Sequence, residues 1–289
     1  MTIQPPMPEL RSQRRRMWNT FVRNRAAVVG LALVIVIVIV TIGAPLFATQ
    51  DPLIQTPSNR LQPPSATNFL GMDSFGRDVY ARLLYAGRVS LIVGVCSVLL
   101  GGSIGTAMGI VAGYSGGHAE NIIMRLVDVL MAFPSLLLGI TVLAVLGSGL
   151  DKMIMAIGLM LSPAFARVVH GNTLSLKELE FVEAARSVGV GRLRILRRHI
   201  LPNIMGDILV LASLWTASAI RIEASLSFIG LGVSPPTPTW GNMIREGAVQ
   251  LTNAPWISLF PGLAILITVF AFNLLGDGLR DVFDPRLQV

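Results

Sequence analysis

The sequence predicts an all-α polytopic membrane protein with six transmembrane helices and a cytoplasmic helix-turn-helix loop between the fourth and the fifth. Three observations support this fold class. Of the 289 residues, 53% are hydrophobic and only 13% are charged, whereas a soluble domain carries about a quarter charged residues. Six apolar runs reach the length of about 20 residues that a membrane-spanning helix needs. Basic residues gather beside alternate runs, as they do on the cytoplasmic side of membrane proteins.

The six runs are long and continuous. They cover residues about 26–47, 89–113, 120–146, 152–171, 203–227 and 257–279. Helices are expected because lipid offers no water to unpaired backbone groups, and barrel strands have only about 10 residues of alternating polarity. The first run exceeds the about 7–15 apolar residues of a signal peptide, so it is expected to be a permanent span. Pro134 in the third run and Pro163 in the fourth are expected to kink their helices.

The distribution of basic residues predicts that both termini are cytoplasmic. With six spans, the N-terminus, the segment 172–202 and the C-terminal tail lie on one side. Their basic residues are Arg11, Arg14, Arg15, Arg16, Arg23, Arg25, Lys177, Arg186, Arg192, Arg194, Arg197, Arg198, Arg280 and Arg286. The positive-inside rule assigns this side to the cytoplasm. The net charge of +7 is attributed to this bias, and no nucleic acid is expected as a partner.

Two segments are expected outside the membrane on the opposite side. In the first, residues 48–88, the part GRDVYARLLYAGRVS is typical of an amphipathic helix. Its apolar side chains are expected to face lipid and its charged ones water or headgroups; these are Val79, Leu83 and Leu84, and Arg77, Asp78 and Arg82. The second, residues 228–256, holds three prolines that exclude a regular helix. Trp240 and Trp256 are interpreted as anchors at the membrane interface.

Small and charged residues inside the runs indicate helix contacts or a polar pathway. Glycines 101, 102, 105 and 109 have the spacing of close helix packing, which is expected within this chain. Arg125 and Asp128 share a helix face and are expected to pair, while Arg221 and Glu223 lie near the outer end of the fifth run. Ionisable residues in spans are costly and often functional. For Glu223, a pathway role and a packing role stay equally open.

The segment 172–202 is a charged insert between apolar runs. One helix precedes Gly189 and Gly191, which are expected to break it. A second helix is expected from about Arg192 to Leu201, where Pro202 ends it. Two short helices lying under the membrane would form a surface that another protein can bind. An amphipathic loop held by lipid headgroups is the alternative, and the residues alone do not decide between them.

The insert resembles the cytoplasmic loop of permease subunits of ABC-type importers. The resemblance rests on Glu183, Ala184, Ala185 and Gly189, followed by Leu201 and Pro202. His199 departs from the family pattern, which usually has an apolar residue there. The segments 69–91, 112–117, 123–138, 225–244 and 272–287 resemble the second permease of dipeptide and oligopeptide importers. Glutathione importers share this pattern, and nickel importers are related.

The resemblance implies a non-catalytic subunit of the bacterial cytoplasmic (inner) membrane that forms half of the pathway for di- or oligopeptides, including glutathione. The implied partners are a second homologous permease, two cytoplasmic ATPases that hold ATP and Mg, and an extracytoplasmic binding protein. The chain itself is expected to bind no cofactor or metal. The six signature residues would couple it to the ATPase. Residues 1–87 would form a tail, first span and external loop, and residues 88–289 a five-helix core with the coupling loop at about 172–202.

Other function classes remain as alternatives. An importer for nickel or another small solute is one. An ion-driven secondary transporter that uses Asp128 and Glu223 as a proton relay is another, although such a machine needs no ATPase-binding loop. A non-transporting membrane anchor is a third. The sequence has no GxxxxGK[ST] phosphate loop, and its three histidines lack the spacing of a metal site.

Overall fold

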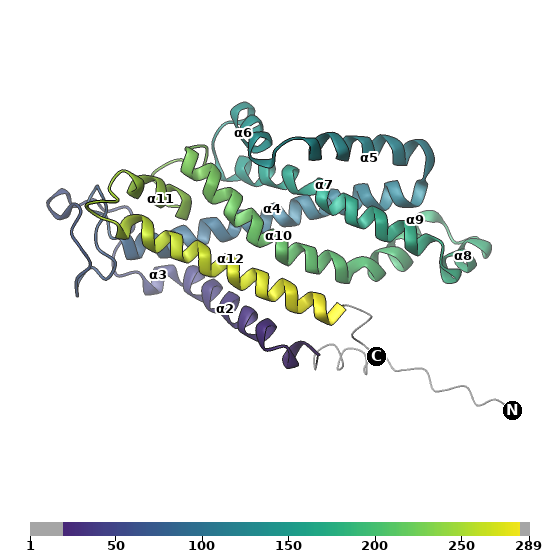
Figure 1. Cartoon of the computed structure of the whole chain (residues 1–289), viewed down its shortest axis with the longest axis horizontal. Helices are drawn as coiled ribbons and strands as arrows, with labels where there is room; N and C mark the ends of the chain where they lie inside the picture. Colours follow the sequence, from purple (N-terminus) through teal and green to yellow (C-terminus); the bar gives the residue numbers. More distant parts are fainter. Residues whose placement is uncertain (1–19, 284–289) are drawn as a thin grey trace.

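The computed structural model describes residues 20–283, which are almost entirely helical (Figure 1). The described residues include five stretches long and apolar enough to cross a membrane, and a sixth if one bent helix pair is counted as a span. The long helices are α2 (Arg25–Ile42), α4 (Val79–Ser115), α7 (Leu150–Lys177), α10 (Leu201–Ile229) and α12 (Trp256–Phe283), and the bent pair is α5 (Gly117–Ala132) and α6 (Ser135–Leu146). The all-α polytopic prediction is confirmed. Arg11, Arg14, Arg15, Arg16 and Arg286 lie outside the described residues.

The bent pair crosses the bundle as one broken span. The helices run between two ends of the molecule, here named the loop end, which carries α8 (Glu180–Ser187), and the far end (Figure 1). α4 and α7 both finish at the loop end, where Gly113 packs against Thr173. α5 begins there directly after α4, and α6 leads into the start of α7 at the far end. The path is therefore that of six spans, with α5 and α6 as the third.

Pro134 breaks this third span more sharply than a kink. The axes of α5 and α6 differ by 97°, and Phe133 between them has an extended backbone, with φ −80° and ψ 136°. A residue before proline avoids the helical region because the proline ring collides with its backbone. The expected distortion at Pro134 is confirmed. Pro163, in contrast, lies within α7, which continues as one helix on both sides of it.

Glycines of α4 allow a close backbone contact with α7. A Cβ atom on Gly105 would collide with the carbonyl oxygen of Ser162 and the side chain of Phe165, both on α7. Gly109 faces the carbonyl oxygen of Ala166 in the same way. These glycines recur every four residues, so they form one face along which the two backbones touch. The expectation that they pack within this chain is confirmed.

α4 begins ten residues before the predicted second span. Asp78 caps it, and its carboxylate accepts a hydrogen bond from the backbone N–H of Ala81 at 2.9 Å. The helix leads into the second span as expected, but Val79 is fully buried and Leu84 nearly so, and the expectation that these two residues face lipid is wrong. The apolar residues of this turn instead join a core with α10, α11 (Trp240–Ala248) and α12.

Arg77 and Arg82, which were expected to face water, are buried in an ion-pair network at the far end. Arg77 donates to Asp73 and to Glu246 of α11, each at 2.6 Å. Arg82 lies 3.2 Å from Glu246 and 3.4 Å from Asp73. Asp78 is buried as well. The network joins the loop before α4 to α11, and its two carboxylates offset the two guanidinium groups that the fold removes from water.

The two tryptophans also hold the far end together. Trp240, which is buried, donates its indole N–H to the carbonyl oxygen of Leu83 at 3.1 Å. Trp256 donates to the carbonyl oxygen of Met72 at 3.2 Å. Trp240 is therefore a core residue of α11, and its interpretation as an interface anchor is wrong. The proline-rich segment before it is not helical, as predicted, but the short helix α11 that follows was not expected.

The glycine contact predicts opposite effects of one methyl group at two glycines. Gly105→Ala should destabilise the chain by about 1–3 kcal/mol, because overpacking a tight contact forces neighbouring atoms apart. Gly171→Ala on α7 should be neutral or stabilising, because nothing lies near its Cβ position and alanine favours helix. Thermal unfolding of both variants in detergent measures this. Equal stability of the two would contradict the packing argument.

The ion-pair network predicts a stability cost for losing one carboxylate. Glu246→Gln should destabilise the chain by about 1.5–3 kcal/mol, the range for hydrogen bonds to charged groups, because Arg77 and Arg82 then share Asp73 alone. Glu178→Gln is the control, since Glu178 is exposed. Unfolding midpoints of the two variants in detergent are compared. A Glu246→Gln midpoint equal to that of the control would mean that the network does not stabilise the far end.

Candidate functional site

The loop at the end of the bundle is built from two helical arms around a glycine turn. α7 leads into α8, and after the turn α9 (Arg192–Ile195) and a π-helical turn, η2 (Leu196–Ile200), lead into α10. α8 lies at the extreme end of the molecule (Figure 1). The predicted helix-turn-helix is thus present. Its second arm, however, is continuous with the fifth span, since α9, η2 and α10 form one run from residue 192 to residue 229.

Pro202 does not end the second arm, contrary to the prediction. The π turn before it moves the backbone pairing back by one residue, so the N–H of Leu201 donates to the carbonyl oxygen of Leu196. Proline at the next position has no N–H to lose and falls in the first turn of α10, where a proline is tolerated. A π turn of this kind inserts a residue without interrupting the helix. The second arm of the loop and the fifth span therefore form one continuous helical run.

Gly189 makes the turn between the arms, as predicted. Its φ of +79° lies in the left-handed region that favours glycine. The N–H of Gly189 donates to the carbonyl oxygen of Arg186, and that of Val190 to the carbonyl oxygen of Ala185, at 2.9 and 3.0 Å. This pair of bonds is the Schellman arrangement that ends helices. The turn thus depends on the backbone freedom of Gly189.

An apolar cluster fixes the loop against the bundle. Val182 and Ala185 of α8 are buried together with Ile195 and Ile200 of the second arm. The cluster continues into the loop ends of α4, α7 and α10. The guanidinium group of Arg186 also lies 4.9 Å from the ring centroid of Tyr114 on α4, a cation–π distance. Packing therefore sets the position of α8, and the loop is not held by lipid contacts alone.

The six predicted coupling residues divide between the surface and the interior. Glu183, Ala184 and Gly189 are exposed, and Pro202 is exposed on α10. Ala185 is buried and Leu201 half-buried, since both pack in the apolar cluster. Glu183 has no ion pair among the described residues and lines a surface hollow of about 570 Å³ with Lys177 and Arg186. The exposed part of the signature is a small-residue surface with one free carboxylate.

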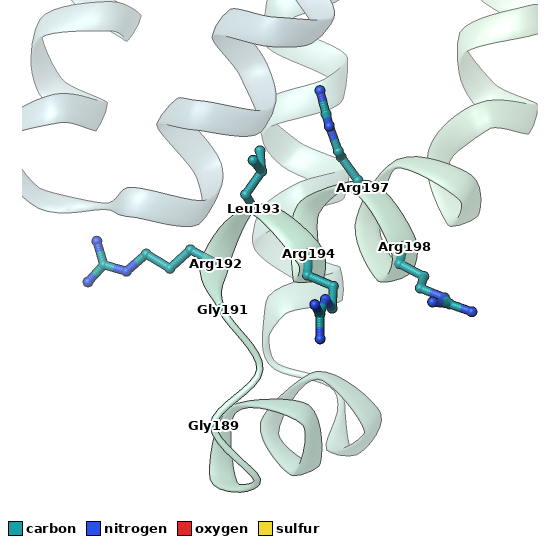
Figure 2. A pocket seen from close by; sticks show the side chains of 7 residues that line it. All are labelled: Gly189, Gly191, Arg192, Leu193, Arg194, Arg197 and Arg198. Carbon is teal, nitrogen blue, oxygen red and sulfur yellow. The ribbon is translucent and has the colours of Figure 1, made fainter.

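Four arginines surround the glycine turn on the second arm. Arg192, Arg194, Arg197 and Arg198 line a hollow of about 800 Å³ together with Gly189, Gly191 and Leu193. Figure 2 shows that their side chains spread in different directions and do not converge on one centre. Within residues 20–283, none of the four forms an ion pair. The arrangement is an extended basic surface around the loop, suited to an acidic macromolecular surface rather than to one small anion.

The charged residues of the third span are not paired as expected. Asp128 accepts a hydrogen bond from Arg167 of α7, and not from Arg125. Helix geometry puts Arg125 and Asp128 on one face of α5. The carboxylate of Asp128 nevertheless bonds to Arg167, which lies on the neighbouring helix α7. Arg125 has no ion pair among the described residues and lines a hollow with Asp128. Sequence reasoning missed Arg167, although its place inside the fourth apolar run flags it by the same rule.

Glu223 is buried between α4 and α10. It is fully inaccessible, and its carboxylate accepts hydrogen bonds from Ser90 at 2.9 Å and from Ser227 at 2.7 Å. Arg221 is exposed two residues earlier. Glu223 thus lies in the packing between these two helices. A role for Arg221 or Glu223 in a pathway stays a prediction.

Comparison with proteins of known sequence identifies full-length relatives. A glutathione transport system permease protein, GsiD, from Pectobacterium atrosepticum is 45% identical over 96% of this chain and 93% of its own length. GsiD from Escherichia coli O6:K15:H31 is 44% identical over 97% and 93%. A dipeptide transport system permease protein, DppC, from Alkalihalophilus pseudofirmus is 40% identical over 95% and 90%.

The fold and two family models agree with these relatives. A solved inward-facing structure of the MetNI methionine ABC transporter superposes with a TM-score of 0.56, covering 70% of this chain and 96% of that one at 19% identity, which shows a shared fold. The N-terminal transmembrane domain of oligopeptide transport permease C matches residues 12–64. A second family model matches residues 105–289, the segment that includes α5 to α12 and the loop. The chain belongs to the family of binding-protein-dependent transport system inner membrane components.

Proposed function

We propose that this chain is one permease subunit of an ATP-driven importer for small peptides, including glutathione. The single observation that carries the proposal is the loop: an anchored helix, a glycine turn and a second arm continuous with a membrane span. The names of its relatives, which are permeases of glutathione and dipeptide transport systems, support the substrate class. ATP hydrolysis takes place on partner subunits, and this chain contributes half of the pathway.

The loop couples the membrane helices to an ATPase. The exposed face of α8, with Glu183 and Ala184, binds in a groove of the ATPase, and the small side chain of Ala184 permits close approach. The basic surface around Gly189 adds electrostatic attraction at the rim of this contact. Because the second arm is continuous with α10, a displacement of the loop is passed to the fifth span without an intervening hinge.

The remaining partners follow from the same proposal. A second, homologous permease completes the pathway, two ATPases bind ATP and Mg on the loop side, and a soluble binding protein delivers the peptide at the far end. The loop end is cytoplasmic, because the basic surface of the loop lies there. The described ends of the chain lie there too: Asn24 donates to Asp281 at 2.6 Å, and Gly206 packs against Phe283.

The first test is uptake by the reconstituted complex. The chain is co-expressed with the neighbouring permease, ATPase and binding-protein genes, and the purified complex is placed in liposomes containing ATP. Accumulation of labelled glutathione or dialanine, dependent on ATP and on the binding protein, is expected. Uptake driven by an ion gradient without ATP would overturn the proposal in favour of a secondary transporter.

A pair of glycine variants tests the coupling role of the loop. Gly189→Val should lower ATP-dependent uptake by roughly tenfold, since a side chain in the left-handed region costs about 1–2 kcal/mol. Gly191→Val is the matched control, because its φ is −63° and nothing lies near its Cβ position. Membrane insertion of both variants is checked by their yield in detergent. Equal uptake by the two would show that the turn geometry is not needed for coupling.

A further inference from the structure

α5 exposes almost its entire surface in this chain. Val127 is its only buried residue, although the helix is half of the third span. Two neighbouring strips run along the exposed surface, at the three- and four-residue spacing of a helix face. The polar strip is Asn121, Arg125 and Asp128, and the apolar strip is Ile122, Leu126 and Val129.

The two strips require different surroundings. The side chains of the apolar strip are between 51% and 71% exposed, so an apolar environment must cover them. The three polar residues line a hollow of about 540 Å³, which Ile122 and Met124 also border. A charged side chain in a span is costly against lipid and is found facing a bundle interior or a water-filled cavity. The charged side chains of the polar strip therefore need water or polar groups around them, whereas Leu126 and Val129 of the apolar strip need an apolar cover.

The polar strip and Arg167 of α7 together carry one positive charge in excess. Asp128 is paired with Arg167 of α7, and Arg125 has no ion pair among the described residues. One turn nearer the loop end, Glu120 lies 2.7 Å from His170 of α7, so that carboxylate is also occupied. Arg125 is thus the cation of this face that remains open to a ligand, and Asn121 offers an amide donor on the same face.

We propose that the polar strip of α5 lines the water-filled pathway and that Arg125 binds the carboxylate of the peptide on its way to the loop end. The inference rests on the proposed function and deepens it by assigning a substrate contact. A guanidinium group presents two parallel donors that match a carboxylate. Peptides and glutathione carry free carboxylates, and Arg125 is the cation of this face that is not already paired with a carboxylate of the described residues. The contact is transient, because a hydrated, half-open site holds a carboxylate weakly.

Cysteine labelling tests the location of the two strips independently of the substrate. The only native cysteine, Cys96, is first replaced by Ser. Two variants, Asn121→Cys and Asp128→Cys, then report on the polar strip. Two others, Leu126→Cys and Val129→Cys, report on the apolar strip. Ser175→Cys, near the loop end, is the control that shows that the reagent reaches the protein. A charged, membrane-impermeant methanethiosulfonate is added to the complex in inverted vesicles.

The polar-strip cysteines should react at least roughly tenfold faster than the apolar-strip cysteines, because the thiolate needs water around it. Dialanine, which has no thiol to consume the reagent, should at saturating concentration slow only the reaction of the polar-strip cysteines. Equal rates on the two strips, with Ser175→Cys reacting, overturn the proposal, whatever the uptake result.

Transport kinetics test the role of Arg125 itself. Arg125→Gln should raise the KM for dialanine or glutathione by roughly tenfold, the size of a charge-assisted hydrogen bond. Arg125→Lys should give an intermediate KM, because an ammonium group keeps the charge but lacks the two parallel donors. Arg23→Gln, which removes an exposed arginine outside the pathway, is the control and should leave KM unchanged. The yield of the assembled complex is measured for each variant, so that loss of assembly is not taken for loss of binding.

The two levels of the proposal fail in different ways. A wild-type complex that imports neither peptide contradicts the proposed function. A wild-type complex that imports a peptide, while Arg125→Gln keeps its KM in a fully assembled complex, contradicts only the role of Arg125. In that case the arginine is a packing residue toward another subunit.

Discussion

The backbone contact between α4 and α7 is the constraint on which the rest of the structure depends. Gly105 and Gly109 bring the two helices closer than any side chain would allow, and both helices then run in register to the loop end. There Lys177 of α7 donates to the carbonyl oxygen of Gly113 on α4 at 2.9 Å. This pair of helix ends forms the platform on which the loop packs. Without the contact between α4 and α7, the apolar cluster beneath α8 would lose the packing of both helices, which contribute Ile110 and Val169.

Arginines at the far end and arginines of the loop differ in burial and in pairing. At the far end, Arg77 and Arg82 are buried and balanced by carboxylates. At the loop end, the arginines of the second arm are exposed and have no ion pairs within residues 20–283. Buried charges need their partners inside the fold, whereas exposed, unpaired ones are free to attract another molecule.

The third span exposes most of its residues in the single chain. Its break at Pro134 separates a polar half, α5, from an apolar half, α6, and most of both is exposed. The other long helices bury at least one continuous face against each other. A span that is exposed in the single chain yet carries Arg125 and Asp128 is stable only where something other than lipid covers its polar side. The completed transporter supplies that environment.

The sequence by itself determined the class of the protein, the six apolar spans and the glycine turn of the loop. These depend on local chemistry: run length, charge placement and the backbone freedom of Gly189. Only the tertiary structure decided which charges meet. Helix spacing predicted that Arg125 pairs with Asp128, but the carboxylate of Asp128 bonds to Arg167 of α7, which is 39 residues away in the sequence. Arg77 was expected in water, yet it lies buried beside Glu246, 169 residues away. Periodicity describes the faces of one helix, whereas side-chain partners depend on how helices far apart in the chain pack together.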